Sequence, residues 1–240
     1  MSAQTYALVT GASRGIGLEF TKQLLARGHH VFACSRAPGR SEELASLDQG
    51  ALTLVPMNVS DPASIEEALA AVAAKTDRLD VVVNNAGINS MSKVLGDHQR
   101  NLGVGALEPT GMIEMIRVNA IGPTLVTQAA LPLLEAAKGR VLNVSSWFAS
   151  IERKSPKGNY GYCVSKAALN MLGRALALEL APRGVLVLML NPGWVRTSMG
   201  GPNAKLSPEE SVRGMLEVLR EADMEQTGGF FDHDGAVHPW

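Results

Sequence analysis

The sequence predicts an α/β fold: a doubly wound, seven-stranded, mostly parallel sheet with helices on both faces, in a single domain over residues 1–240. Short apolar runs alternate with helix-length segments along the chain. Several of these runs, such as VVV at 81–83 and VLVLML at 185–190, are apolar without alternation, which is typical of strands covered on both faces. Of the 240 residues, 46% are hydrophobic and only 19% are charged, as in a packed globular protein. We find no linker, repeat or low-complexity tract.

The strands and helices follow one another in order. The predicted strands are Tyr6–Thr10, His30–Cys34, Leu52–Pro56, Leu79–Asn84, Gly139–Ser145, Val185–Leu190 and Gly229–Phe231. The predicted helices are Ile16–Ala26, Pro62–Lys75 (with Asp61 as its N-cap), Gly111–Ala137, Tyr160–Leu180 and Pro208–Glu221. Residues 89–109 and 196–207 are polar, Gly-rich connections that follow strands. Both are therefore expected at the carboxyl edge of the sheet, as substrate-side loops.

Charge and cysteine content narrow the class of protein. The chain has 22 basic and 23 acidic residues, so nothing in it favours nucleic acid or a membrane surface as a partner. Its two cysteines, Cys34 and Cys163, make no disulfide framework, and the N-terminus lacks a signal-peptide pattern, so a cytoplasmic location is predicted. No segment holds about 18 uninterrupted apolar residues, which argues against a transmembrane helix. No metal site is predicted.

The segment TGASRGIG at Thr10–Gly17 lies between the first predicted strand and the first predicted helix. Its glycines differ in spacing from the common GxGxxG fingerprint, but the physical argument is similar. Gly11 permits a sharp turn, while Gly15 and Gly17 let the backbone approach a pyrophosphate and let the helix pack on the sheet. The free N–H groups of the helix N-terminus favour an anion there. The alternative is an ordinary Gly-rich turn.

The same residues also match GxSxG, the pattern of a serine hydrolase turn. Ser13 would then be the nucleophile, and Asp232 with His233 or His238 would complete a triad in the right chain order. This is the minor alternative, because hydrolase sheets usually place such a turn well inside the chain and because it leaves the other motifs unexplained.

The end of the second predicted strand, VFACSR at 31–36, bears on the choice of dinucleotide. Proteins that bind NAD usually carry an acidic residue here, which bonds the ribose 2′-hydroxyl. No acidic residue lies between positions 20 and 41 of this chain. It offers Ser35, Arg36 and Arg40 instead, with Arg14 in the glycine-rich loop. Arginines suit a 2′-phosphate, so the sequence predicts NADP(H), with NAD(H) less favoured. Alternatively, Arg36 is an ordinary surface charge.

Three short motifs point to chemistry at the ends of other elements. LDVVVNNAG at 79–87 ends a strand in amides and small residues, which fits close approach to a ribose. NVSSW at 143–147 places a serine where it can hydrogen-bond a substrate oxygen. YCVSK at 162–166 places Tyr162 and Lys166 on one face of a helix. A nearby ammonium favours tyrosinate, so Lys166 is expected to lower the pKa of Tyr162 and prepare it for proton exchange with a carbonyl or alcohol oxygen. Each motif alone is also compatible with a structural role.

Taken together, these motifs resemble those of the short-chain dehydrogenase/reductase family. TGASRGIG, NNAG, the Asn119 of IRVNAIGP, NVSS, YCVSK and NPGWVRT occur in the family's order and at about its spacings, over nearly the whole chain. Within the family, the chain resembles the carbonyl-reductase-like branch that includes sniffer and the bacterial C-factor proteins. The resemblance implies a Rossmann-type fold and an oxidoreductase that transfers a hydride between NADP(H) and a small carbonyl or alcohol substrate.

The resemblance also implies roles for particular residues. Tyr162 would be the general acid/base, Lys166 would hold the nicotinamide ribose, Ser146 would orient the substrate carbonyl and Asn119 would hold a proton-relay water. Ser145 is the less favoured serine, because the family usually uses the second of the pair. The implied cofactor-binding residues are Gly11, Ser13, Arg14, Gly15, Ile16, Gly17, Ser35, Arg36, Asn58, Val59, Asn85, Ala86, Gly87, Tyr162, Lys166, Pro192, Gly193, Val195 and Thr197.

The chain departs from the family pattern at three places. Asn58 stands where the family usually has Asp, although an amide can still bond the adenine amino group. The segment 151–161 is a few residues longer than is usual in the family, and it carries charge. Because it borders the substrate entrance, the identity of the substrate stays open. Tyr160 lacks a lysine four residues on, so it is not the acid. The aromatic and sulfur side chains proposed to line an apolar pocket, or else to pack the interior, are Trp147, Phe148, Trp194 and Met199.

The 160–180 helix is apolar on more than one side, which predicts burial against the sheet on one face and against a second subunit on another. The resemblance implies a homodimer built on this helix and the 111–137 helix, and burial within one chain is the alternative. A signalling protein of C-factor type, which binds the nucleotide with little turnover, is a second open function.

Overall fold

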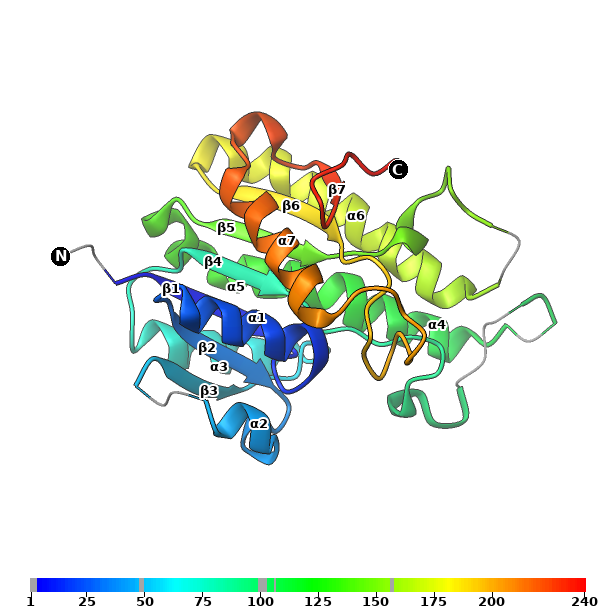
Figure 1. The fold of residues 1–240 in the computed structure, drawn as a ribbon, viewed down its shortest axis with the longest axis horizontal. Helices are drawn as coiled ribbons and strands as arrows, with labels where there is room; N and C mark the ends of the chain where they lie inside the picture. The colour runs from blue at the N-terminus through cyan, green and yellow to red at the C-terminus, as the bar shows by residue number, and fades with distance from the viewer. Residues whose placement is uncertain (1–3, 48–49, 99–102, 106, 156–157) are drawn as a thin grey trace.

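Seven parallel strands form one sheet in the order β3-β2-β1-β4-β5-β6-β7 in the computed structural model, which describes residues 4–47, 50–98, 103–105, 107–155 and 158–240 (Figure 1). The strands are β1 Tyr6–Thr10, β2 His30–Ser35, β3 Leu52–Pro56, β4 Val81–Asn84, β5 Arg140–Val144, β6 Leu186–Asn191 and β7 Phe230–Asp232. Every neighbouring pair is parallel, including β6 and β7. The chain leaves β1 toward β3 and then returns to start β4 on the other side of β1, so the order of the strands reverses between β1 and β4. The predicted doubly wound fold is confirmed.

Helices cover both faces of the sheet (Figure 1). They are α1 Gly15–Ala26, α2 Glu42–Ala45, α3 Pro62–Ala73, α4 Pro109–Ile116, α5 Gly122–Ala137, α6 Tyr160–Leu180 and α7 Pro208–Glu221. Successive residues of β1 face opposite ways: Ala7 and Val9 pack into a core with α1 and α7, while Leu8 packs into a second core with α3, α5 and α6. Both faces of the strand are therefore buried, which is why its sequence is apolar without alternation.

The predicted Gly111–Ala137 helix is the largest difference between expectation and structure. The helical segment starts earlier, at Pro109, where the Glu108 side chain accepts hydrogen bonds from the first turn. It is interrupted by a π-helical turn at Arg117–Ile121, after which α5 continues to Ala137. Pro123 offers a physical reason: it has no N–H, so an unbroken α-helix would leave the Asn119 carbonyl without its partner. In the turn, the N–H of Gly122 donates to the Arg117 carbonyl, five residues back.

The other predicted elements are present, with ends that shift by up to two residues. The sequence prediction missed α2, which begins after Ser41, whose side chain accepts from the Leu44 N–H. It also missed the short 3₁₀ segments at Pro38–Arg40, Lys93–His98, Trp147–Ala149, Ala181–Arg183 and Met224–Gln226. Within the described residues, no helix combines the length and the apolar character needed to cross a membrane.

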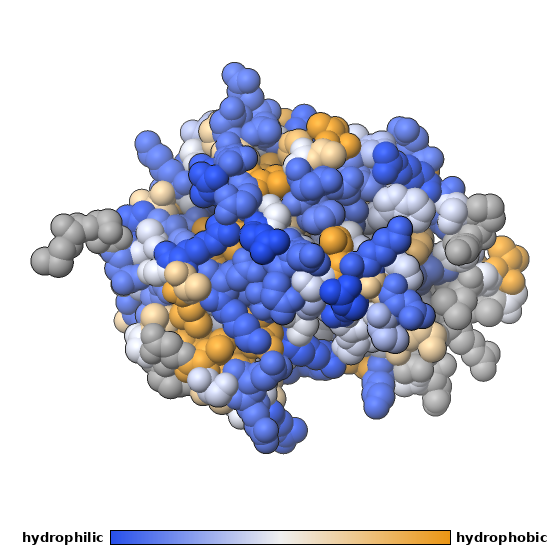
Figure 2. All heavy atoms as spheres, viewed as in Figure 1, coloured by the Kyte–Doolittle hydropathy of each residue, from blue (hydrophilic) through white to orange (hydrophobic). Residues whose placement is uncertain are grey.

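The carboxyl ends of all seven strands lie along one edge of the sheet, because every pair is parallel (Figure 1). The two predicted substrate-side loops leave the sheet at this edge, after β4 and after β6. Residues 99–102 and 106 of the 89–109 loop, and residues 156–157 of the 151–161 segment, lie outside the described residues. Figure 2 shows the α1 and α7 face of the molecule, which is largely hydrophilic, with hydrophobic atoms gathered near the sheet edge formed by β3.

Candidate active site

The glycine-rich loop joins β1 to α1 in a conformation that needs glycine. Gly11 has a positive φ of 67°, and a Cβ there would lie 2.9 Å from the Ala86 Cα atom. A Cβ at Gly17 would lie 2.2 Å from the Gly11 carbonyl oxygen, so the loop and the first turn of α1 pack backbone on backbone. Arg14 provides no side-chain cap for α1 among the described contacts, and the first turn contains no acidic residue. This helix N-terminus therefore suits an anion.

The end of β4 is tied to this loop. The Asn85 Nδ2 donates to the carbonyl oxygens of Thr10 at 2.9 Å and of Gly11 at 3.3 Å. The Thr10 Oγ1 accepts the N–H groups of Asn85 at 3.0 Å and Ala86 at 3.1 Å. The Asn85 amide thus holds the glycine-rich loop. Gly87 brings the backbone after β4 close to Asn119, because a Cβ on Gly87 would lie 3.3 Å from the Asn119 Oδ1.

The carboxyl end of β2 lies beside the glycine-rich loop, since the Ser41 hydroxyl donates to the Ser13 carbonyl at 2.8 Å. Arg14, Arg36 and Arg40 are exposed. The Ser35 Oγ is buried and has no hydrogen-bond partner among the residues that the structure describes. A buried hydroxyl without a partner is costly unless a ligand or water completes it. This part of the site therefore fits a polar group bound between β2 and α1.

Asn58 and Val59 follow β3 at the same edge. The Asn58 Oδ1 accepts from the backbone N–H of Ser60 at 3.3 Å and from its hydroxyl at 3.0 Å. A Cβ at Gly122 would lie 2.5 Å from the Val59 carbonyl oxygen, so the start of α5 packs directly on this turn. Both residues are partly exposed at the edge.

Tyr162 and Lys166 lie one turn apart on α6, as predicted. The Lys166 Nζ is 5.9 Å from the centre of the Tyr162 ring and donates to the Val144 carbonyl at 2.7 Å. Of the neighbouring polar side chains, that of Ser146 acts on Tyr162, where it lowers the pKa of the phenol. Ser145 instead donates to the Asn170 Oδ1 at 2.6 Å in the interior. The structure therefore brings Ser146, and not Ser145, to the tyrosine hydroxyl.

The expectation that Lys166 lowers the pKa of Tyr162 is wrong for this structure. Burial raises the pKa of Tyr162 to about 12, against the opposing effect of the Ser146 hydrogen bond. Burial also lowers the pKa of Lys166 to about 8. Lys166 is buried and Tyr162 is partly buried, and desolvation, which disfavours the charged form of each, is the largest influence on both pKa values.

Asn119 lies in the π-helical turn and is fully buried. Its Oδ1 accepts the Ile88 N–H at 2.8 Å, and its Nδ2 donates to the Ile88 carbonyl at 2.8 Å and to the Ser165 hydroxyl at 2.9 Å. The amide thus joins the loop after β4 to α6. The π turn places a polar side chain at a position that an unbroken helix would have rotated elsewhere.

The segment after β6 also lies at the carboxyl edge of the sheet. Gly193 has a positive φ of 75°, and a Cβ there would meet the Leu206 side chain at 2.5 Å. Val195 is buried and pairs with Leu206 in a short bridge. The Thr197 methyl group lies 3.4 Å from the position of a Cβ on Gly15, so this loop reaches the glycine-rich loop. The Pro192 carbonyl accepts the Ser211 hydroxyl of α7 at 2.7 Å.

Of the four side chains considered for an apolar pocket, Phe148 packs against the tyrosine. Its ring centre lies 6.1 Å from that of Tyr162, edge to face, and the Trp147 ring centre lies 5.7 Å from that of Phe148. Trp194 and Met199 are exposed on the loop after β6, where the Trp194 indole donates to the Gly200 carbonyl.

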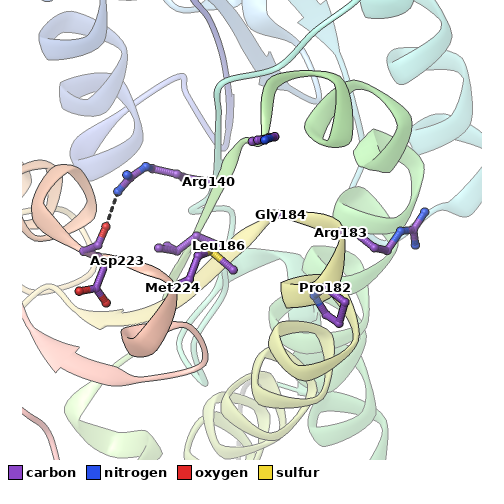
Figure 3. Close-up of a pocket in the computed structure, with 9 residues that line it drawn as sticks. Arg140, Pro182, Arg183, Gly184, Leu186, Asp223 and Met224 are labelled. Atoms are coloured by element: carbon purple, nitrogen blue, oxygen red, sulfur yellow. Dashed lines mark hydrogen bonds between the residues drawn. The ribbon is translucent and has the colours of Figure 1, made fainter.

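A cavity of about 610 Å³ lies away from all these residues (Figure 3). It is lined by Lys138, Arg140, Pro182, Arg183, Gly184, Leu186, Ala222, Asp223 and Met224. Arg140 and Leu186 are the first residues of β5 and β6, so the cavity opens at the amino edge of the sheet, opposite the motif residues. The Arg140 guanidinium is held there by the Ala222 carbonyl at 2.8 Å. None of the described residues that line this cavity belongs to the candidate site.

The hydrolase alternative is not supported by the fold. Asp232 and His238 do pair, with 2.8 Å between the carboxylate and the His238 Nδ1. Ser13, however, follows β1, and Asp232 ends β7, four strand positions away in the sheet. At ~4.8 Å per strand this separation is roughly 19 Å, far beyond hydrogen-bond reach.

Sequence reasoning missed several side chains that build the site. Asn191, at the end of β6, accepts the N–H groups of Trp147 at 2.9 Å and Gly193 at 3.3 Å through its Oδ1. Thr10, Ser41 and Ser165 hold the glycine-rich loop and Asn119, as described above. A signal was available, because Thr10 and Asn191 are polar residues at the ends of otherwise apolar strands.

The fold and these motif residues define a nucleotide-dependent oxidoreductase scaffold, and comparison with known proteins gives its family. The sequence model described as short chain dehydrogenase matches residues 5–206. The chain therefore belongs to the short-chain dehydrogenase/reductase family of oxidoreductases, and the predicted family is confirmed.

Individual relatives fit the predicted branch. The chain is 34% identical to the NADPH-bound carbonyl reductase from chicken fatty liver, with a TM-score of 0.87 over 99% of this chain and 100% of that one. It is 27% identical to the carbonyl reductase Sniffer of D. melanogaster, with a TM-score of 0.90 over 99% and 100% of the two chains. The C-signal of Myxococcus xanthus is 41% identical over 166 residues, which cover 69% of this chain and 95% of that protein.

Proposed function

We propose that the protein is an NADP(H)-dependent reductase of small aldehydes or ketones, or equally the reverse alcohol dehydrogenase, with Tyr162 as general acid/base. The observation that carries the proposal is the contact of the Ser146 side chain with Tyr162 beside the buried Lys166, at the carboxyl edge of the sheet. Asn119 and the glycine-rich loop lie at the same edge. The likeness to two carbonyl reductases supports the same chemistry.

Bound NADPH would supply the hydride. The chain's own residues supply its binding and the proton. The N-terminus of α1 and Arg14 would hold the pyrophosphate, Asn58, Val59, Ala86 and Gly87 would line the adenosine and ribose path, and the loop from Pro192 to Thr197 would seat the nicotinamide. The unpartnered Ser35 hydroxyl and exposed Arg36 fit a 2′-phosphate at the end of β2.

Burial favours the protonated form of Tyr162 in the protein alone. With a pKa of about 12 in the protein alone, Tyr162 holds its proton at neutral pH and can donate it to a carbonyl oxygen that gains charge. Lys166, with a pKa of about 8, is mostly protonated at pH 7 and would stabilise the tyrosinate that results. Ser146 would steady the substrate oxygen beside Tyr162.

The first test is a fluorescence titration of the protein with NADPH and with NADH, followed by a carbonyl screen. We expect NADPH to bind more tightly than NADH, and Arg36→Asp to weaken NADPH binding by about 10- to 100-fold, because it removes one charge-assisted contact and adds a repelling carboxylate. Arg213→Asp makes the same charge change on the exposed surface of α7 and should leave both affinities unchanged. Equal affinities for the two cofactors would contradict the NADP preference, and binding of neither would contradict the function.

One relative favours a second candidate function. The C-signal likeness is compatible with a signalling protein that binds the nucleotide with little turnover. This candidate predicts tight NADPH binding without reduction of any carbonyl in the screen, which the same titration and screen detect.

We also propose that the chain forms a homodimer through α6 and the α4–α5 segment. Val164, Met171 and Leu178 lie seven residues apart on α6 and are exposed, as are Ile113 and Ile121 on the neighbouring segment. We expect a dimer by light scattering, and a monomer for Met171→Glu, which places a charge in the centre of this stripe. Met224→Glu, elsewhere on the surface, is the matched control. A monomeric wild type would contradict the proposal.

Both cysteines are free thiols, which fits the proposed cytoplasmic location.

A further inference from the structure

A chain of hydrogen bonds links the Ser146 turn to residues 232–240. It begins at Asn191, whose Oδ1 accepts the Trp147 N–H at 2.9 Å and the Gly193 N–H at 3.3 Å. Trp147 directly follows Ser146, and Gly193 lies in the loop proposed to seat the nicotinamide. One amide oxygen therefore fixes the backbone on both sides of the reacting centre.

Asp232 determines which way this amide points. The Asn191 Nδ2 donates to the Asp232 Oδ1 at 2.6 Å. A carboxylate can only accept, so it selects the orientation in which the amide nitrogen faces Asp232 and the amide oxygen faces the two backbone N–H groups. Without this acceptor, an amide turned the other way would present its own N–H groups to those of Trp147 and Gly193.

His238 holds Asp232 from the other side. Its Nδ1 lies 2.8 Å from the same Asp232 oxygen, and its ring packs 4.6 Å from the ring of Phe230. The side chain is fully buried, and its Nε2 has no hydrogen-bond partner within the described part of the chain. The imidazole is therefore not positioned as a catalytic base. Its N–H fixes the carboxylate, and the carboxylate in turn keeps the proton on Nδ1.

The same tail also holds the far end of the Ser146 segment. The Trp240 carbonyl accepts the Glu152 N–H at 2.9 Å and the Ser150 hydroxyl at 3.1 Å. The tail folds back on β7, since the His238 N–H donates to the Phe230 carbonyl at 2.8 Å. The segment from Ser146 to Glu152 is thus fixed near one end by Asn191, 44 positions after Trp147, and near the other end by Trp240, 90 positions after Ser150.

We propose that Asp232 and His238 are positioning residues for the reduction: they orient the Asn191 amide, which sets the backbone of the Ser146 turn and of Gly193. This inference rests on the proposed function for its effect on turnover. Its structural half, the fixing of the Trp147 and Gly193 amides, does not depend on any activity.

The first experiment compares Asp232→Ala with Asp234→Ala. Asp234 lies in the same turn and is exposed, and within the described part of the chain its side chain accepts only the Ala236 N–H. We expect Asp232→Ala to lower kcat by about 10- to 100-fold, the loss typical of a small displacement of a reacting group, with KM for the carbonyl changed much less. Hydrogen exchange at the Trp147 and Gly193 amides should accelerate. Asp234→Ala should match the wild type in both measurements.

The second experiment separates positioning from general loss of structure. His238→Asn can keep a donor for Asp232 and should retain most of kcat, whereas His238→Leu keeps the packing on Phe230 but loses the donor and should behave as Asp232→Ala. In a Ser146→Ala background, Asp232→Ala should cost less than twofold, because the residue acts through the serine turn. An equal loss in both backgrounds would overturn the proposal.

The outcomes distinguish this inference from the proposed function. If the wild type is active and Asp232→Ala is equally active with unchanged amide exchange, the positioning role is wrong and the reductase function stands. If the wild type reduces no carbonyl but Asp232→Ala accelerates exchange at Trp147 and Gly193, the function fails and the structural half stands. Unchanged exchange overturns the positioning role in either case.

Discussion

Replacing Tyr162 by Phe should lower kcat/KM for carbonyl reduction by about 10²- to 10⁴-fold, the range for loss of a positioned general acid. The substitution removes only the hydroxyl that contacts Ser146. The ring remains, so its packing 6.1 Å from Phe148 should persist, and the melting temperature should change little. The measurement is the steady-state rate with the best carbonyl from the screen, together with the dissociation constant for NADPH, which should stay within about threefold of the wild type.

Tyr160→Phe is the matched control for this prediction. Tyr160 lies two residues earlier on the same helix and is partly exposed, and position 164, one turn on, is a valine rather than a lysine. The control should keep full activity. Full activity in Tyr162→Phe, or an equal loss in both variants, would contradict the role of Tyr162 as the acid.

Replacing Lys166 by Met should stabilise the protein without cofactor while abolishing its activity. The side chain is only 4% exposed, and burial lowers its pKa from 10.5 to about 8. That difference corresponds to about 3 kcal/mol of destabilisation of the folded state at pH 7. Loss of the 2.7 Å bond to the Val144 carbonyl offsets about 1 kcal/mol of the gain. We expect a net gain of about 2 kcal/mol in the free energy of unfolding, or about 4–8 °C in the melting temperature of a chain of this size.

The pH dependence of this gain identifies its cause. Between about pH 8 and pH 10.5, the unfolded chain holds a proton on Lys166 that the folded chain has lost, so the stability of the wild type rises with pH across that interval. The Met variant lacks this group, and its advantage should therefore be full below pH 8 and shrink steadily toward pH 10.5. Thermal unfolding of the two proteins at pH 7, 8, 9 and 9.5 measures the difference.

Lys75→Met, at an exposed position after α3, is the control for the removal of one lysine from the surface. Its difference from the wild type should not vary with pH in this way. A Lys166→Met variant that is less stable than the wild type at pH 7 would mean that the ammonium is stabilised in the folded state. The favourable interaction of Lys166 with Tyr162 that the sequence predicts would then outweigh the cost of burying the ammonium.

The sequence by itself determined the fold class and most of the elements. Unbroken apolar runs such as those of β4 and β6 can be stable only where both faces are covered, and this requires a parallel sheet with helices on both sides. It also determined that Tyr162 and Lys166 share a helix face, because their spacing of four residues is a local property of the helix. The glycine-rich loop was predictable from its own residues, since Gly11 and Gly15 adopt positive φ, while its attachment to Asn85 depends on the tertiary structure.

Only the tertiary structure decided what depends on residues far apart in the sequence. The hydrogen bonds of Asn119 to Ile88 and Ser165 join segments distant in the chain, and the bond of Ser145 to Asn170 directs that serine into the interior. The pKa of Tyr162 was predicted in the wrong direction, because the spacing shows the neighbouring charge but not the burial that outweighs it. The link from Ser146 through Asn191 and Asp232 to His238 joins segments brought together by the pairing of β5, β6 and β7. The spacing of apolar residues shows which face of each segment is buried. Desolvation and long-range hydrogen bonds depend instead on which segments pack together.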